Sequence, residues 1–429
     1  MILKSLPVAG DTGPMQPDEI QKSKILKALE DQDTSVLVED PLESDMVLNM
    51  GPQHPATHGV LRILLRLDGE TIVNSVPELG YLHRGYEKLA ENCTYHEFIT
   101  HTDRLDYLAP LSNNVGYVQA VEKLVGLEIP GRAKYIRVVC CELARISSHL
   151  VWLGSMAMDV GALTILLWTF REREKLYDIF DVLTGARFTT SYTRIGGVSQ
   201  DMTDECAAMI KDFIEQFPEK LEECENLLNK NRIFIGRTDG VGVISREQAI
   251  DIGLTGPSLR ACGVEYDIRR ADPYLIYDQL DFRIPVFEGG DSLARYYVRN
   301  EEMRESAKIV RQVLEKIPSG PIKAHEPRQV LAQKQRVYTK MEELIQDFMV
   351  INFGINPPIG EIYRPIESPK GELGFYIISD GSGNPWRLKI RVPSMVNLQA
   401  LPIFLKGRMV SDVVAIIGSL DPVMGEADK

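Results

Sequence analysis

Histidine can exchange a proton near neutral pH, and this chain gathers most of its histidines near one end. Four of the seven, His54, His58, His83 and His96, fall within a window of 43 residues, and His101 follows. Such residues can donate protons, hold hydrogen bonds or bind a metal. No thiolate or carboxylate pattern beside them completes a familiar metal site, so proton chemistry is favoured over metal binding. His96 and His101 are expected to be structural hydrogen-bonding residues.

Two of these histidines lie in a loop with a restricted backbone. The segment GPQHPATHG (51–59) contains Pro52 and Pro55, which fix their own φ angles and restrict the residue before each. The segment therefore predicts a shaped loop, in which His54 and His58 are held in place.

A second possible proton donor follows in the motif DRLDY (103–107). A helix predicted over 86–108 would put Asp103 and Tyr107, four residues apart, on one face. The tyrosine hydroxyl can donate a hydrogen bond or a proton. The competing interpretation is an ordinary helix-end ion pair beside a packed tyrosine.

Asp159 interrupts the apolar run at 150–170, which is nearly as long as a membrane span. A charge at the centre of a bilayer costs on the order of several kcal/mol, so a helix buried inside protein is predicted. A buried carboxylate must pair or take up a proton, and such acids also tune histidines. Glu142, Arg145 and His149 share one helix face upstream and predict an internal polar network with a structural role.

The composition is that of a folded protein and excludes several classes. The formal net charge is −13 and the isoelectric point is near 5.2, which disfavours nucleic-acid binding. The chain has no phosphate-binding loop, no dinucleotide fingerprint and no nucleophile motif. The six cysteines form no CxxC pair, so neither a disulfide framework nor a cysteine metal site is expected, and a reducing, cytoplasmic compartment fits best. The N-terminus lacks the apolar core of a secretory signal.

The elements that must position these residues begin with a hairpin. Asp68-Gly69 separates two strand-like runs, 60–67 and 70–73, which is a strong hairpin signal. A two-residue loop would set Leu67 opposite Glu70 and, further along, His58 opposite Leu79. The segments 51–59 and 80–88 would then converge at the open end of the hairpin.

Helices are predicted next, over 86–108, 113–126, about 132–183 with Gly185 as the C-cap, 203–231 ended or kinked at Pro218, 246–252, 299–316 and 339–352. A second hairpin is predicted from strands at 373–378 and 387–392. The fold class is therefore α+β and mainly α-helical. We expect an N-terminal extension (1–44), an N-terminal β-hairpin region (45–85), a helical core (86–370), and a C-terminal hairpin and tail returning to the site (371–429).

Long motifs resemble one known family. GPQHPATHGVLR (51–62), GYLHRGYEK (80–88), DRLDYL (103–108), ELARISSHLVWLG (142–154), GLTGPSLRACGVEYDIR (253–269) and SLDPVMGEAD (419–428) are similar to the D subunit, the 49-kDa-type subunit, of NADH-quinone oxidoreductases (respiratory complex I). The resemblance covers roughly residues 45–429, in the order of the family.

The resemblance implies a helical core like that of the nickel–iron hydrogenase large subunit, from which the family descends. Hydrogenases hold their metals with two CxxC motifs, and this chain has Asp421-Pro422-Val423 and DRLDYL at the corresponding places. Thiolates are the soft ligands that such metals need. The metal cavity is therefore expected to persist as a pocket for an organic substrate, without hydrogenase activity and without metal or iron–sulfur ligands in this chain.

By resemblance, His58 and Tyr107 match the residues that hydrogen-bond the two carbonyl oxygens of the quinone head, and Asp159 matches the acid that pairs with that histidine. His54, His83 and Arg84 belong to the matching loops of the quinone pocket. The resemblance also implies that electrons arrive from an iron–sulfur cluster in the B subunit. It further implies contacts with the C and I subunits and with the membrane-embedded H subunit, and a peripheral location on the cytoplasmic face of the bacterial inner membrane.

Two other functions compete with this one. A noncatalytic scaffold with a hydrogenase-like fold would predict an empty or filled cavity between His58 and Tyr107. The equivalent subunit of a quinone reductase linked to ferredoxin or another donor would share the same pocket, because the donor binds elsewhere in the complex.

Overall fold

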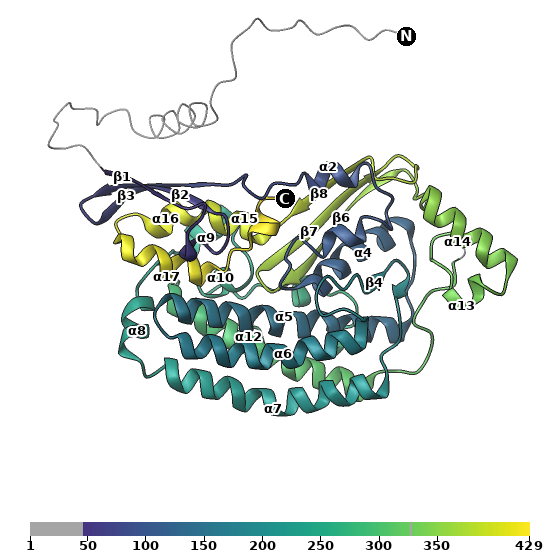
Figure 1. Cartoon of the computed structure of the whole chain (residues 1–429), viewed down its shortest axis with the longest axis horizontal. Coiled ribbons are helices and arrows are strands. Elements are labelled where there is room, and N and C mark those ends of the chain that lie inside the picture. Colours follow the sequence, from purple (N-terminus) through teal and green to yellow (C-terminus); the bar gives the residue numbers. More distant parts are fainter. Residues whose placement is uncertain (1–45, 327) are drawn as a thin grey trace, which may run out of the picture. The chain divides into compact units, whose positions relative to one another are not determined.

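The structure, a computed structural model, describes residues 46–326 and 328–429, so the predicted N-terminal extension (1–44) lies outside the described residues. The described chain opens with a three-stranded sheet of β1 (Met46–Met50), β2 (Arg62–Asp68) and β3 (Thr71–Glu78), in the order β1-β2-β3 (Figure 1). The hairpin predicted at Asp68-Gly69 is confirmed, since β2 and β3 are antiparallel neighbours.

The predicted register of this hairpin is wrong. Leu67 pairs with Ile72 instead of Glu70, and Asp68 pairs with Thr71, so the loop residues are Gly69 and Glu70. Gly69 supplies the left-handed backbone of the turn, with φ +58. A bulge between Arg66 and Leu67 shifts the ladder once more. Because β2 begins at Arg62, His58 lies outside the ladder and does not pair with Leu79.

The region after this sheet is less helical than predicted. Only α2 (Tyr86–Ala90) and α3 (Ile99–Thr102) form in the segment 86–108, and Asp103–Tyr107 are in turns. Tertiary hydrogen bonds outweigh helix propensity there. The Asp103 carboxylate accepts from the backbone N–H and hydroxyl of Ser191, and the Asn113 side chain donates to the carbonyl of Asp106.

Long helices form most of the helical core. They are α4 (Pro110–Val125), α5 (Gly131–Asp159), α6 (Leu163–Thr184), α7 (Asp204–Leu228) and α12 (Ser292–Lys316). Helix α7 runs along the lower edge of this core in Figure 1. Helix α5 packs between α6 and α12, and α7 contacts both of those helices. The single helical region predicted over 132–183 is divided at 160–162, where Gly161 adopts φ +95, and Gly185 caps α6 as predicted. Helix α7 continues through Pro218 to Leu228, so of the two predicted effects of this proline, an end or a kink, the end does not occur.

In the sequence, shorter helices lie between α7 and α12 and between α12 and the second sheet. They are α8 (Arg232–Thr238), α9 (Arg246–Ile252), α10 (Gly256–Arg260), α11 (Ile268–Ala271), α13 (Lys334–Val337) and α14 (Met341–Phe353). The predicted helix at 246–252 is confirmed, and a capping box of Ser245 and Gln248 fixes its start.

A second antiparallel sheet covers α4. It contains β6 (Gly360–Ser368), β7 (Gly371–Ser379) and β8 (Arg387–Arg391), and the hairpin of β7 and β8 is as predicted. Strand β6, which pairs with β7 along its full length, was not predicted from the sequence. Gly116 of α4 allows the close approach, since a Cβ there would lie 3.0 Å from Ile366 Cδ1.

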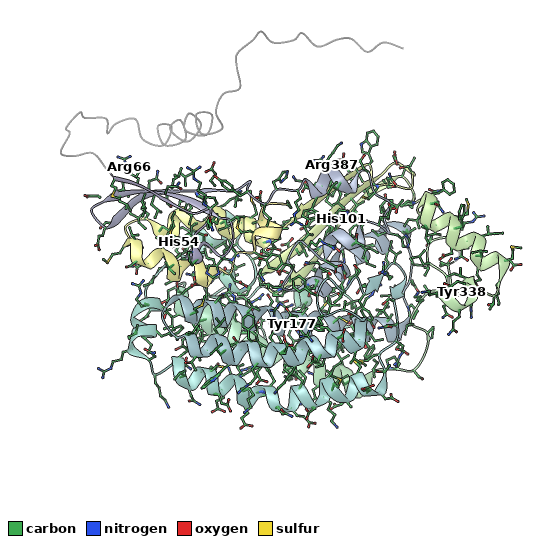
Figure 2. All side chains as sticks on the ribbon, in the orientation of Figure 1. His54, Arg66, His101, Tyr177, Tyr338 and Arg387 are labelled. Atoms are coloured by element: carbon green, nitrogen blue, oxygen red, sulfur yellow. The ribbon has the colours of Figure 1, made fainter. Side chains whose placement is uncertain are left out.

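The chain ends in four short helices: α15 (Pro393–Gln399), α16 (Leu401–Leu405), α17 (Val410–Leu420) and α18 (Met424–Ala427). Helix α17 contacts α5, α12 and η1 (Pro55–Thr57), the 3-10 turn that begins after His54 (Figure 2). The α+β, mainly helical fold class is thus confirmed. Among the described residues, no helix combines enough length and apolar character to cross a membrane.

Candidate functional site

His58 and Asp159 meet although they lie far apart in the sequence. His58 ends the η1 turn in a left-handed conformation (φ 50), and Asp159 is the last residue of α5. His58 Nε2 lies 2.8 Å from Asp159 Oδ2, and both side chains are mostly buried, with 14% and 8% exposed. Because Nε2 is engaged with the carboxylate, Nδ1 is the nitrogen left to face another group.

Gly418 of α17 makes room for this pair, and sequence reasoning missed it. A Cβ on Gly418 would lie 3.0 Å from Asp159 Oδ2 and 3.7 Å from His58 Nε2. The indole N–H of Trp152 donates to the Gly418 carbonyl at 2.7 Å, which ties α17 to α5 at this level. Any larger residue at position 418 would therefore press on the pair.

Tyr107 lies in the wall of a cavity of about 320 Å³. The other lining residues come from four separate segments: Leu82, Arg84, Tyr86, Arg104, Phe188, Thr189 and Gly425. No hydrogen bond to the Tyr107 hydroxyl forms within the described part of the chain, and Tyr107 lines the cavity, so this donor is available to a ligand. Burial raises the pKa of Tyr107 above the usual 10, so the phenol is neutral and able to donate at pH 7.

The C-terminal helix α18 lies between the two candidate donors. A Cβ on Gly59, next to His58, would lie 3.1 Å from Met424 Cγ. A Cβ on Gly425 would lie 3.1 Å from Tyr107 Cδ1 and 2.6 Å from the carbonyl oxygen of Leu105. The small residues let α18 touch both loops, so the last residues of the chain fix the relative positions of the two segments.

Of the remaining predicted pocket residues, one lines the cavity beside Tyr107 and two do not. Arg84 lines the cavity and donates to the Tyr86 hydroxyl at 3.3 Å. His83 is 58% exposed and its Nδ1 lies 4.0 Å from Asp428 Oδ1. His54 caps η1 by accepting from the Ala56 N–H at 3.2 Å, which is a local structural role. His54, His58, His83 and Asp159 are not among the residues that line the cavity beside Tyr107.

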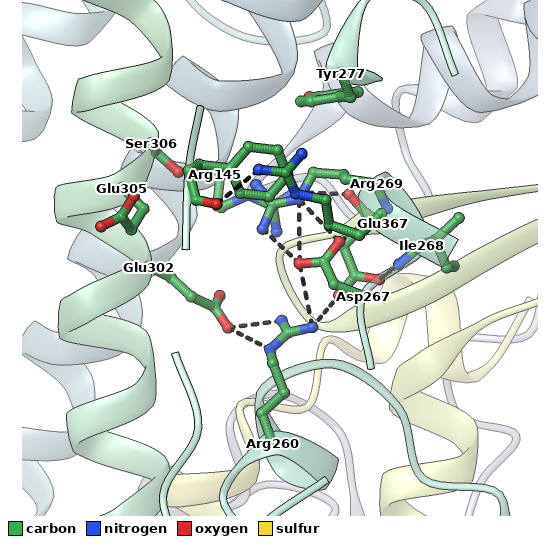
Figure 3. Close-up of polar contacts among 12 residues, drawn as sticks. Arg145, Arg260, Asp267, Ile268, Arg269, Tyr277, Glu302, Glu305, Ser306 and Glu367 are labelled. Carbon is green, nitrogen blue, oxygen red and sulfur yellow. Dashed lines mark hydrogen bonds and ion pairs between the residues drawn. The ribbon is translucent and has the colours of Figure 1, made fainter. Parts of the chain in front are cut away.

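The predicted polar network around Glu142, Arg145 and His149 is present and buried. Figure 3 shows it extending to Arg260, Asp267, Arg269, Tyr277, Glu302, Ser306 and Glu367. Arg260 contacts Glu302 at 2.6 Å and Glu367 at 2.9 Å, and His149 Nε2 lies 2.9 Å from Glu302. Burial lowers the pKa of His149 to about 4, so it is neutral. These contacts join α5, α10, α12 and the end of strand β6.

A second buried cluster was not predicted from the sequence. The Lys370 ammonium lies 3.1 Å from Asp106 Oδ2 and 3.3 Å from Asp421 Oδ2, and it donates to the Ser148 hydroxyl at 2.7 Å. Asp106 directly precedes Tyr107, so the cluster lies behind the wall of the cavity. The signal that could have found it is the DRLDYL motif, whose second aspartate must pair once it is buried.

The arrangement can supply protons to a bound ligand and can hold it by hydrogen bonds. Tyr107 offers a neutral phenol, and the imidazole of His58 has a carboxylate behind it to balance a positive charge. In the described ranges, no group of three or more His, Cys, Asp or Glu side chains is placed to hold a metal ion. The six cysteines are free, and none of them belongs to either buried ionic cluster.

Comparison with known proteins gives a consistent result. Residues 159–429 match the family model described as "Respiratory-chain NADH dehydrogenase, 49 Kd subunit". The chain is 60% identical to the D 1 subunit of NADH-quinone oxidoreductase from Chloroherpeton thalassium, over 96% of this chain and 94% of that protein. It is 56% identical to the D subunit of the Salinibacter ruber enzyme (91% and 87%) and 59% identical to that of Methylacidiphilum infernorum (90% and 92%). The chain therefore belongs to the family of the 49-kDa-type subunit, the D subunit, of NADH-quinone oxidoreductase (complex I).

Proposed function

We propose that this chain forms the quinone-binding wall of NADH-quinone oxidoreductase and supplies protons to the quinone head. One observation carries the proposal: the Tyr107 hydroxyl stands unpartnered at a cavity of the described chain, in a member of a family whose relatives are named for quinone reduction. A neutral phenol can donate to a quinone carbonyl oxygen and can then transfer its proton as that oxygen gains charge.

Reduction of a quinone to a quinol takes two electrons and two protons. In the proposed mechanism Tyr107 gives one proton to one oxygen, and His58 gives the other through Nδ1, since Nε2 is held by Asp159. The carboxylate of Asp159 stabilises the protonated imidazole before the transfer. After it, the pair carries one negative charge, and proton uptake restores both donors.

The electrons must come from another chain of the complex. In the proposed assembly an iron–sulfur cluster of the B subunit supplies them one at a time, the C and I subunits complete the peripheral part, and the membrane-embedded H subunit admits the quinone tail. The chain would then lie on the cytoplasmic face of the inner membrane as a peripheral component. Exposed apolar residues at the start of α6, Leu163, Leu167 and Phe170, offer a surface for such contacts.

The test uses membranes that contain the assembled complex with His58→Ala or Asp159→Asn. Each variant should lose most of its NADH-driven, inhibitor-sensitive quinone reduction, because a general acid contributes about 10²–10⁴-fold. NADH oxidation with an artificial acceptor that bypasses the quinone should remain, and subunit content should be normal. The exposed His325 supplies a matched control, since His325→Ala should leave both activities unchanged. Full quinone reduction in both site variants would refute the proposal.

One observation favours a second candidate, a scaffold without a catalytic role. Tyr107 and His58 do not line the same cavity, and α18 lies between their loops. A scaffold predicts that Asp159→Asn changes the amount of assembled complex while the rate of quinone reduction per complex stays constant.

A further inference from the structure

The buried cluster behind Tyr107 holds more acid than base. Lys370 contacts two carboxylates, those of Asp106 and Asp421, and a third acid, Glu426, lies nearby on α18. All four side chains are buried. Three ionised carboxylates beside one ammonium would leave a net charge of −2, and an uncompensated charge in the interior is costly. A proton kept by one of the three acids would reduce this imbalance.

Glu426 is the acid with the weakest compensation. Its Oε1 accepts from the Ser394 backbone N–H at 3.1 Å, whereas Oε2 is buried with no hydrogen-bond partner in the described chain. No ion pair joins Glu426 to Lys370 among the described residues, whereas Asp106 and Asp421 both touch the ammonium. A protonated carboxyl group needs no counter-ion, and this agrees with the isolation of Glu426.

Three further cations, Arg299, Arg173 and Lys429, act through longer-range charge on Asp421, Asp106 and Glu426 respectively, and none of them forms an ion pair with these acids in the described chain. Arg299 of α12 points its guanidinium at the carbonyls of Ser419 and Leu420. Arg173 of α6 lies over the ring of Tyr177. Lys429, at the end of the chain, pairs with Glu87 at 3.6 Å.

Glu426 is also close enough to influence Tyr107. Its neighbour Gly425 packs against the Tyr107 ring, and Asp106 of the same cluster is adjacent to Tyr107 in the sequence. Negative charge at Glu426 opposes formation of a tyrosinate, because it raises the pKa of Tyr107.

We propose that Glu426 carries a proton in the resting enzyme and that this proton keeps Tyr107 able to donate. Glu426 is thus a positioning residue that acts through charge, and the inference rests on the proposed function of Tyr107. No electron moves in this step. When Glu426 loses its proton to solvent, the cluster gains one negative charge, proton transfer from Tyr107 becomes less favourable, and quinone reduction slows.

Burial and the charge of Asp106 raise the pKa of Glu426 to about 8. The proton should therefore be present at pH 7 and lost above pH 8. Quinone reduction by the wild-type complex should decline on the alkaline side with an apparent pKa of about 8.

The experiment is a pH profile from pH 6 to 10 of NADH-driven quinone reduction in membranes, for wild type, Glu426→Gln, Glu426→Asp and Tyr107→Phe. Rates are divided by NADH oxidation with an artificial acceptor at each pH, and each profile is scaled to its own maximum. Glutamine cannot ionise and keeps an acceptor for the Ser394 N–H, so Glu426→Gln should lose the alkaline decline near pH 8. Glu426→Asp should keep a decline, because its carboxyl group still titrates.

The outcomes distinguish a failure of the role inferred for Glu426 from a failure of the proposed function of Tyr107. Reduced quinone activity in Tyr107→Phe, with an unchanged alkaline decline in Glu426→Gln, overturns the role of Glu426 and leaves the proposed function standing. Full activity in Tyr107→Phe overturns the proposed role of Tyr107 and the inference with it. A wild-type profile that stays flat between pH 7 and 9 also contradicts the inference. If Glu426→Gln fails to assemble, Glu426→Asp decides, because loss of the decline in that variant contradicts a titrating carboxyl at this position.

Discussion

Replacing Arg260 with methionine should destabilise the protein severely, because this guanidinium neutralises acids that no solvent reaches. Arg260 is fully buried, and it contacts Glu302 at 2.6 Å, Glu367 at 2.9 Å and Asp267 at 3.5 Å (Figure 3). Methionine fills a similar volume but carries no charge. Glu367 would then keep Arg145 and Arg269 as nearby cations, and Glu302 would keep Arg299, but none of these replaces the direct contacts of Arg260.

The size of the expected destabilisation follows from the cost of leaving one charge of a buried ion pair without its partner. Removing one partner of a buried pair leaves an uncompensated charge and costs about 3–5 kcal/mol. Native proteins are stable by only about 5–15 kcal/mol, so this change removes a large share of the total. Because the unfolding entropy grows with chain length, a chain of 429 residues shifts by about 1 °C per kcal/mol, so the unfolding temperature should fall by roughly 3–6 °C.

Arg283 provides the matched control. It also pairs with two acids, Glu305 at 3.0 Å and Glu301 at 3.3 Å, but its side chain is 75% exposed. Solvent screens exposed ion pairs, so Arg283→Met should change the unfolding temperature by no more than about 2 °C. The assay heats detergent-solubilised complex and measures by immunoblot how much of this chain stays soluble. Equal effects of the two substitutions would refute the counter-ion argument.

Two further predictions concern stability. Burial lowers the pKa of His96 and of His149 to about 4, whereas an unfolded histidine titrates near 6.5. The unfolded chain therefore binds more protons between these values, so the stability is full above pH 6.5 and falls as the pH drops toward 4. His96→Leu should make the fall in unfolding temperature over this range shallower, and an unchanged slope would contradict neutral burial of His96. Gly154→Ala should cost about 1–3 kcal/mol, because the new Cβ would lie 2.5 Å from Thr169 Oγ1 between α5 and α6. Gly236→Ala, in open space within α8, should stabilise by about 0.5–1 kcal/mol, and the opposite order in thermal unfolding would contradict this packing argument.

Local signals in the sequence predicted much of the fold. The Asp-Gly turn, the C-terminal hairpin and the long helices all have periodicity or turn chemistry within a few residues. The register of the first hairpin could not be predicted, because a bulge and a shifted loop leave no clear mark in the residue types. The helix predicted over 86–108 failed because Asp103 is bonded to Ser191, a residue 88 positions away.

The candidate site, like the fold, could be predicted from the sequence only in part. His58, Tyr107 and Asp159 could be selected because their types are unusual where they occur and because their motifs resemble those of a family. Gly418 and Lys370 could not, since a glycine in a helix and a lone lysine look ordinary until distant segments are placed beside them. The role of Lys370 becomes apparent only in the structure, where Asp106 and Asp421, from two other parts of the chain, lie beside it.

The central claim is that quinone binds beside Tyr107. The most direct test is labelling of the assembled complex with a photoreactive quinone analogue, followed by mass spectrometry of the labelled peptides. We expect label on cavity-wall residues such as Tyr107, Phe188 and Gly425, suppressed by excess quinone and reduced by Tyr107→Trp, which fills the cavity. Label confined to other chains of the complex, or unaffected by Tyr107→Trp, would contradict the claim.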